Sequence, residues 1–344
     1  MTKNNTLQLP QEPINNWLEQ NVAGFKGPAT LQKFAGGQSN PTYKINAASG
    51  SYVLRGKPVG ALLPSAHAID REYRLLKALH PTGLPVPEPV AFCDDTTITG
   101  SCFYVMQLVE GRIFWNGGLD DLALSQKRPI YTAMVDTLAQ LHVVDPSAVG
   151  LADFGRPGNY FARQVDRWTR QYRASQTDDI SAMESLIDWL PRAMPEQKGT
   201  SIIHGDYRID NIIFEQGRPA VAAVLDWELA TLGDPLADIT NLAMNWILPA
   251  DGRSGLAGLD LIEAGLPTME EILELYSAAT GREKIRDPHW YFAYGLFRLT
   301  SIIQGIKKRN ADGNASSPDA QSTIARLGPI SDLAWTQARI AGAR

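Results

Sequence analysis

The stretch that decides the fold reads His204-Gly205-Asp206-Tyr207-Arg208-Ile209-Asp210-Asn211, and a second acidic pair follows in Asp226-Trp227-Glu228. Each of Asp206, Asn211 and Asp226 lies at one end of a short apolar run that is typical of a β-strand. The last two runs are separated by a Gly-Arg-Pro turn, which predicts a hairpin. A strand, a loop and a hairpin in this order can bring the three side chains to one rim.

An aspartate next to an Asn–Asp pair suits phosphoryl transfer. The transition state of that reaction spreads charge over three oxygens, and catalysis is mostly alignment and charge neutralisation, with Mg²⁺ bridging phosphate oxygens. Because Mg²⁺ prefers carboxylate and amide oxygens, we expect Asn211 and Asp226 to hold it. Asp206 would accept the proton of an attacking hydroxyl, and Arg208 would stabilise the moving phosphate. Any one of these residues alone is more often a turn cap, so the prediction depends on their combination.

Composition narrows the possible classes of protein. The 344 residues are 44% hydrophobic and 20% charged, which is typical of an ordinary globular protein with one large domain or two smaller ones. A net charge of −5 argues against a nucleic-acid partner, which requires a basic face. Two cysteines cannot build a disulfide framework. The start is polar and no apolar run reaches about 18 residues, so we expect no membrane partner and a cytoplasmic protein.

The strand and helix patterns divide the chain into two lobes. The first ~106 residues contain several short alternating apolar runs and one helical pattern at 67–80, which together predict a small sheet with one helix. Beyond them the apolar spacing is mostly helical, apart from the short strands between 202 and 227. We therefore predict an α+β protein with a β-rich N-terminal lobe (1–106), a hinge (107–112) and a mainly helical C-terminal lobe (113–344).

The motif His204-Gly205-Asp206, with Asn211 and then Leu225-Asp226-Trp227-Glu228, resembles the catalytic core of the aminoglycoside phosphotransferase-like family. That family has the bilobal protein-kinase-like fold, as do choline and homoserine kinases. The stretch 226–238 is similar to the branch that also occurs fused to acyl-CoA dehydrogenases. The resemblance covers about residues 30 to 305, with the strongest motifs between 202 and 240. It implies an enzyme that moves the γ-phosphate of ATP, with Mg²⁺, to a hydroxyl of a small molecule.

The resemblance also implies a nucleotide site in the N-terminal lobe. Arg55 occupies the place where kinases put the lysine that binds the α- and β-phosphates, which is a departure from the family pattern. Lys57, two residues further on, remains the alternative. Glu72 would hold the cation, because it lies on the apolar face of the predicted helix and an inward carboxylate needs a cationic partner.

Two further elements are implied by the same resemblance. The stretch Gly36-Gly37-Gln38-Ser39-Asn40 resembles the loop that covers the nucleotide. Gly36, Gly37 and Ser39 would contact the phosphates there, since glycines let backbone N–H groups approach phosphate and Ser39 adds a hydroxyl. The same residues are also compatible with an ordinary hairpin turn. Asp234 and Asp238 correspond to the family's later acidic pair, which would brace the loop of Asp206 and begin a helix.

The phosphate acceptor is the least determined part of the prediction. The dehydrogenase-associated branch favours a hydroxylated metabolite or an acyl derivative over an aminoglycoside. A polycationic acceptor would use acids such as Glu263, Glu270, Glu271 and Glu274, although acids that open a helix also complement its dipole. The alternative function is a catalytically silent, kinase-like nucleotide-binding module that regulates a partner. The presence of Asp206 with both predicted metal ligands favours activity.

Overall fold

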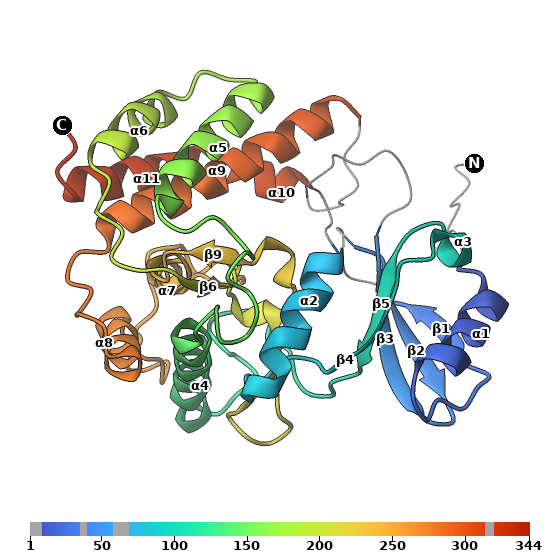
Figure 1. The fold of residues 1–344 in the computed structure, drawn as a ribbon. Coiled ribbons are helices and arrows are strands. Elements are labelled where there is room, and N and C mark those ends of the chain that lie inside the picture. Colours follow the sequence, from blue (N-terminus) through green and yellow to red (C-terminus); the bar gives the residue numbers. More distant parts are fainter. Residues whose placement is uncertain (1–8, 35–39, 58–68, 314–319) are drawn as a thin grey trace. The chain divides into compact units, whose positions relative to one another are not determined.

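The computed structural model describes residues 9–34, 40–57, 69–313 and 320–344 (Figure 1). Contacts divide the chain into two compact units, each of which is discontinuous in sequence. The first comprises Met1–Ile113, Val149–Leu151 and Asn211–Ala230, and the second comprises Phe114–Ala148, Ala152–Asp210 and Thr231–Arg344. The lobe boundaries at 106 and 112 stay a prediction. The segment Asn211–Ala230 belongs to the first unit, although it comes late in the chain.

The first unit is built on a five-stranded antiparallel sheet with the order β1-β2-β3-β5-β4. Its elements are α1 (Gln11–Asn21), β1 (Thr30–Lys33), β2 (Thr42–Ala47), β3 (Gly50–Gly56), α2 (Ile69–Leu79), β4 (Pro89–Cys93), α3 (Thr96–Thr99), β5 (Phe103–Gln107), and the hairpin of β7 (Ile212–Phe214) and β8 (Val221–Val224). Figure 1 shows α1 and α2 on opposite faces of the sheet.

Strand alternation explains what each face of this sheet carries. Successive side chains of a strand point to opposite faces of the sheet. Leu54 of β3 and its neighbour Arg55 therefore lie on different faces. Leu54 packs with Phe103 and with Ile14 and Leu18 of α1 in one fully buried cluster. Arg55 is directed to the other face, where α2 packs against β4 and β5. The sheet therefore packs an apolar core on the face of α1 and carries the polar side chain of Arg55 on the face of α2.

The second unit is mainly helical and has one short strand pair. Its elements are α4 (Leu124–Val143), α5 (Tyr160–Ser175), α6 (Ser181–Arg192), β6 (Ser201–Ile203), β9 (Thr231–Gly233), α7 (Leu236–Ala243), α8 (Met269–Thr280), α9 (His289–Ala311), α10 (Ala320–Ala325) and α11 (Leu327–Ile340). The central helix α9 packs against α5, α7 and α11, and α4 packs against α8 and β6. A β-rich first part and a helical second part confirm the predicted α+β class.

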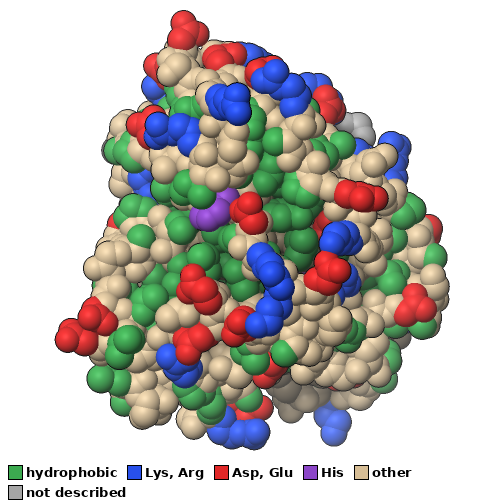
Figure 2. All heavy atoms as spheres, turned by 90° about the vertical axis from the view of Figure 1, so that its left-hand side faces the viewer, with side chains coloured by type: hydrophobic (Ala, Val, Ile, Leu, Met, Phe, Trp, Pro, Cys, Tyr) green, Lys and Arg blue, Asp and Glu red, His purple; other side chains and the backbone are tan. Residues whose placement is uncertain are grey.

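Two further observations concern the length of the apolar helices and the distribution of charge on the surface. Within the described ranges, no helix combines the length and the apolar character that crossing a bilayer requires. On the face shown in Figure 2, acidic and basic side chains are interspersed and do not gather into one large patch of a single sign.

Replacing Leu18 with alanine should destabilise the first unit, because this α1 side chain is fully buried against the sheet. We expect a loss of about 2–5 kcal/mol in the free energy of unfolding, measured by urea titration. Leu124→Ala is the matched control, because Leu124 is 56% exposed at the start of α4. Its effect should stay below about 0.5 kcal/mol. Equal effects of the two substitutions would contradict the packing of α1 described above.

Candidate active site

Arg55 lies between two carboxylates of the first unit. Its Nε donates to Oε2 of Glu72 on α2 at 3.0 Å, and its Nη2 donates to Oδ1 of Asp226 at 2.6 Å. The Glu72 side chain is 3% exposed and that of Arg55 13%, whereas that of Asp226 is 37% exposed. A guanidinium carries several N–H groups in one plane, so a single arginine can serve both acids. The alternative cation, Lys57, extends the pairing of β3 and β5 by one residue, because its backbone N–H donates to the Cys102 carbonyl at 3.1 Å.

Burial and charge act in opposite directions on this cluster. Burial opposes the charge of Arg55, but the carboxylates of Glu72 and Asp226 outweigh it and raise the pKa of the guanidinium above its usual value. Burial raises the pKa of Glu72, and the charge of Arg55 limits that increase. Burial also raises the pKa of Tyr104, which faces Arg55 across β3 and β5 and hydrogen-bonds Glu72. Tyr104 therefore keeps its proton and supports the buried acid as a donor.

The hairpin of β7 and β8 brings the two predicted metal ligands together. Ile212 pairs with Val224, so Asn211 and Asp226 flank the open end of the hairpin. The backbone N–H of Leu225 donates to the Asn211 carbonyl at 2.8 Å. Asp226 itself has a left-handed backbone, with φ 62° and ψ 63°, which is uncommon outside glycine. The short 3₁₀ turn that follows fixes it, because the Trp227 indole donates to the Val224 carbonyl at 2.9 Å.

Asn40 ends the stretch 36–40 that resembles the nucleotide-covering loop, but its contact with Glu228 was not predicted from the sequence. Asn40 is 2% exposed, and its Nδ2 donates to Oε2 of Glu228 at 3.3 Å. The other loop residues predicted to bind nucleotide, Gly36, Gly37 and Ser39, lie outside the described residues.

Asp206 lies in the second unit, on the loop that follows β6. The buried carboxylate of Asp238 accepts the backbone N–H of His204 at 2.6 Å and that of Gly205 at 2.8 Å. His204 Nδ1 in turn accepts the Asp206 N–H at 3.2 Å. Gly205 has a φ of 83°, a conformation that favours glycine. The backbone beside Asp206 is thus fixed, while Asp206 itself is partly exposed.

The bracing of this loop by Asp238, implied by the family resemblance, is confirmed. Asp234 also acts as expected, because its Oδ1 accepts the Leu236 N–H at 2.9 Å where α7 begins. Arg208 is exposed and forms an ion pair with Asp210 inside the loop, with Nε donating to Oδ1 at 3.1 Å. The role of Arg208 in phosphate binding stays a prediction.

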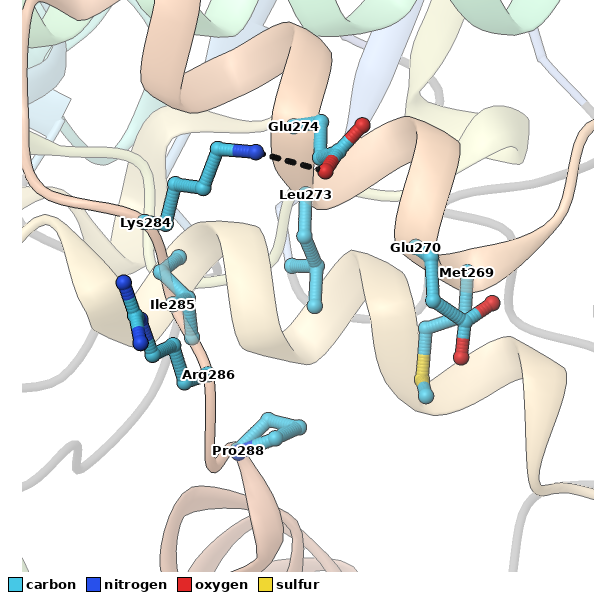
Figure 3. A pocket seen from close by; sticks show the side chains of 8 residues that line it. All are labelled: Met269, Glu270, Leu273, Glu274, Lys284, Ile285, Arg286 and Pro288. Carbon is cyan, nitrogen blue, oxygen red and sulfur yellow. Dashed lines mark hydrogen bonds and ion pairs between the residues drawn. The ribbon is translucent and has the colours of Figure 1, made fainter.

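The acids of α8 serve local purposes. Glu271 caps the helix by accepting the Thr268 N–H and also pairs with Arg128 at 2.7 Å. Glu274 pairs with Lys284 at 2.8 Å beside a surface pocket of about 270 Å³ (Figure 3). The pocket is lined by Met269, Glu270, Leu273, Glu274, Lys284, Ile285, Arg286 and Pro288, and by none of the residues predicted for catalysis or nucleotide binding. These acids therefore give little support to a polycation site.

The chain is similar to solved structures that are described as phosphotransferases. A crystal structure from Ralstonia eutropha JMP134, provisionally described as an aminoglycoside phosphotransferase, is 42% identical with a TM-score of 0.89, and the match covers 97% of this chain and 99% of that one. Spectinomycin phosphotransferase APH(9)-Ia, solved with ADP and spectinomycin, is 11% identical with a TM-score of 0.62, covering 97% and 99%. Together with the α+β architecture, these likenesses define the protein-kinase-like fold.

The chain belongs to the phosphotransferase enzyme family, whose profile matches residues 30–275. A curated relative, acyl-CoA dehydrogenase family member 10 of Mus musculus, is 43% identical over 342 residues, covering 98% of this chain and 32% of the relative. The chain therefore spans about a third of the length of that relative, which agrees with the predicted dehydrogenase-associated branch.

Replacing Arg55 with methionine should leave Glu72 buried without its cation. Breaking one side of a buried ion pair costs about 3–5 kcal/mol, and we expect a loss of that order in the free energy of unfolding. Glu72→Met in the same background should recover part of the loss, so that a double-mutant cycle gives a coupling of about 0.5–3 kcal/mol.

The pH dependence gives a second measure of the same pair. Without Arg55 the pKa of Glu72 rises further, so the folded state keeps a proton that the unfolded state releases. The deficit of Arg55→Met should therefore shrink as the pH falls. Lys57→Met is the matched control, with little effect on stability. If the double-mutant cycle of Arg55→Met and Glu72→Met gave no coupling energy, the ion pair would not contribute to the stability of the fold.

Proposed function

We propose that the protein is an ATP- and Mg²⁺-dependent phosphotransferase that moves the γ-phosphate of ATP to a hydroxyl group of a small molecule. The observation that carries the proposal is the shared contact of Arg55 with Glu72 and Asp226. It links a cation suited to phosphate with an acid suited to metal, inside one compact unit. Membership of the family and the likeness to a protein solved with ADP support the same function.

The nucleotide would be bound mainly by charge and backbone. Arg55 would contact the α- and β-phosphates, and Glu72 would hold the guanidinium in place, because an arginine fork binds phosphate oxygens in two directions. Gly36, Gly37 and Ser39 would cover the phosphates with backbone N–H and hydroxyl donors.

The donor set on the hairpin fits Mg²⁺. The Asn211 amide and the Asp226 carboxylate offer the oxygen ligands that this ion prefers, and Mg²⁺ usually takes few ligands from protein and the rest from phosphates and water. Among the described residues, no group of three or more His, Cys, Asp or Glu side chains gathers to form a complete metal site. An ion held partly by Asn211 and Asp226 and partly by the phosphates of the nucleotide does not require a complete protein site. The ion, when bound, would neutralise charge on the phosphates.

Asp206 would act as the general base. It would accept the proton of the acceptor hydroxyl while the hydroxyl oxygen bonds to the γ-phosphorus and the bond to the bridging oxygen of ADP breaks. Hydrogen bonds of the His204, Gly205 and Asp206 backbone N–H groups fix the main chain from which the base projects. Arg208 would leave Asp210 to stabilise the transferred phosphate.

The acceptor we favour is a hydroxylated metabolite or a hydroxylated acyl derivative. The name of the Mus musculus relative associates this type of chain with acyl-CoA chemistry. The ion pairs of Glu271 and Glu274 leave little unpaired acid on α8 for an aminoglycoside. An aminoglycoside-like acceptor remains the alternative within the same reaction class.

A silent nucleotide-binding module is the second candidate function. Its supporting observation is the 2.6 Å contact between Arg55 and Asp226, which occupies the carboxylate proposed for metal. In that case the protein would bind nucleotide without metal. Adding an acceptor would not cause the protein to form and release ADP. Measuring nucleotide affinity and ADP release on the same preparation separates the two functions.

Asp206→Ala should abolish phosphoryl transfer and leave ATP affinity within about twofold, because the base contacts the acceptor and not the nucleotide. Wild type is first screened for ADP release with hydroxyacyl-CoA esters and aminoglycosides side by side. Asp210→Ala, in the same loop, is the control and should retain most turnover. Full turnover by Asp206→Ala would refute the assignment of the base.

Asp226→Asn should weaken nucleotide binding in the presence of Mg²⁺ much more than in its absence. A neutral amide is a poorer ligand for a hard cation than a carboxylate, and we expect about a tenfold loss in the affinity for MgATP. Calorimetric titration with ATP, with and without Mg²⁺, measures both values. Glu228→Gln, two residues away, is the control. An unaltered Mg²⁺ dependence would count against Asp226 as a ligand.

A further inference from the structure

Two arginines of the second unit lie over the ring of one buried tryptophan. Cζ of Arg167 on α5 lies 5.4 Å from the ring centroid of Trp168, and Cζ of Arg298 on α9 lies 5.5 Å from it. The two helices pack against each other (Figure 1). Trp168 is 7% exposed, whereas Arg298 is half-buried and Arg167 is exposed. The indole therefore gathers two positive charges at a place that water reaches.

Neither Arg167 nor Arg298 forms an ion pair with a carboxylate of the described residues. The other three arginines of α5 do have partners: Arg170 pairs with Asp166, Arg173 pairs with Glu184, and Arg163 donates to two main-chain carbonyls. Attraction to the face of an aromatic ring holds a guanidinium in place, but it does not neutralise the charge. Two like charges that are held close together repel each other. An anion bound to both guanidiniums would remove this repulsion.

The polar groups beside the two guanidiniums are uncharged. The indole N–H of Trp168 is buried near the Tyr294 hydroxyl, but no acceptor among the described residues lies in hydrogen-bond geometry with it. Burial raises the pKa of Tyr160 and Tyr294, so both hydroxyls keep their protons. The charges of Arg298 and Arg167 oppose that increase at both hydroxyls, because the four groups lie close together. The tryptophan and the two tyrosines are thus neutral hydrogen-bond donors.

Tyr160 connects this cluster with the loop of Asp206. Its ring packs on Gly233 of β9, where an added Cβ would lie 2.7 Å from Tyr160 Cδ2. β9 pairs with β6, and Ile203, the last residue of β6, directly precedes the loop. The Tyr160 hydroxyl also experiences the charge of Asp238, the carboxylate that braces the loop. The two arginines therefore lie one tyrosine side chain away from the strand pair that leads to the proposed base.

We propose that Arg298 and Arg167 form a subsite for an anionic group, a carboxylate or a phosphate, of the small molecule that accepts the phosphoryl group. A planar guanidinium binds either kind of group through paired N–H donors, and two guanidiniums over one ring can share one anion. The assignment to the acceptor rests on the proposed function, whereas binding of the anion does not. Such a subsite favours an acidic acceptor over a polycationic aminoglycoside, which the two arginines repel.

Substitutions at the two arginines separate charge from geometry. Arg298→Gln and Arg167→Gln remove the charge, whereas Arg298→Lys keeps the charge and loses the planar fork. Arg170→Gln is the matched control, because Arg170 lies on the same helix as Arg167 and pairs with Asp166. The probes are 3-hydroxybutyrate, its coenzyme A ester and 1,3-butanediol. The diol has the carbon skeleton of 3-hydroxybutyrate without the carboxylate, and the ester carries phosphates in place of it.

The first readout is the NMR signal of the Trp168 indole N–H, which is identified by its loss in Trp168→Phe. Each probe is titrated in the presence of excess ADP and Mg²⁺, so that the ester is kept from the nucleotide site and no turnover is needed. We expect a saturable shift with 3-hydroxybutyrate if the subsite takes a carboxylate, or with the ester alone if it takes a phosphate, and no shift with the diol.

The variants test whether the arginines bind the anion. Arg298→Gln and Arg167→Gln should each weaken binding about 10- to 100-fold, Arg298→Lys should weaken it less, and Arg170→Gln should stay within about twofold of wild type. The proposal is overturned by the lack of a saturable shift with both anions, by an equal shift with the diol, or by unchanged affinity in the glutamine variants. Arg167 is exposed, so Arg167→Gln decides should Arg298→Gln not fold.

The second readout is ADP release with the acceptors that wild type phosphorylates. For an anionic acceptor, kcat/KM of Arg298→Gln should fall about 10- to 100-fold, mainly through KM for the acceptor, while KM for ATP stays within about twofold. An equal loss in Arg170→Gln, or a loss confined to kcat, would overturn the assignment to the acceptor. Absence of ADP release with every acceptor would refute the proposed function, while the indole titration still decides whether the arginines bind an anion.

Discussion

The buried contact of Arg55 with Glu72 and Asp226 is the interaction on which the first unit depends. Two carboxylates, one of them almost inaccessible to water, are held near each other by a single cation. Without it the buried Glu72 would have no cation to offset its desolvation and would keep only the hydrogen bond from Tyr104. The same geometry suits the proposed binding of nucleotide, because phosphate oxygens compete with carboxylate oxygens for a guanidinium. In the proposed function, stability without ligand and binding of nucleotide would be two uses of the Arg55 side chain.

In the second unit, buried side chains hold the short irregular loop that carries Asp206 in a fixed conformation. Backbone N–H groups on such a loop have no strand partner, and Asp238 supplies acceptors for two of them. Placing an ionised carboxylate in the core requires donors on all sides, and His142 is one of them. The buried polar network thus holds the backbone that carries the partly exposed Asp206.

Much of this could be predicted from local sequence, and the remainder depends on distant contacts. The apolar runs beside Asp206, Asn211 and Asp226 predicted the short strands, and the hairpin that brings Asn211 and Asp226 together follows from its turn residues. The partner of β6 is β9, not a strand of that hairpin, and no local pattern encodes this pairing. His142 was missed because a single histidine on an apolar helix face is indistinguishable from a core histidine until Asp238 is seen beside it.

The exchange of partners at Arg55 is tested most directly by a crystal structure of the wild-type protein with Mg²⁺ and a non-hydrolysable ATP analogue. The account predicts the Arg55 guanidinium within about 3 Å of phosphate oxygens, still paired with Glu72 and no longer in contact with Asp226. A bound nucleotide whose phosphates are held by other cations, with Arg55 still on Asp226, would contradict it.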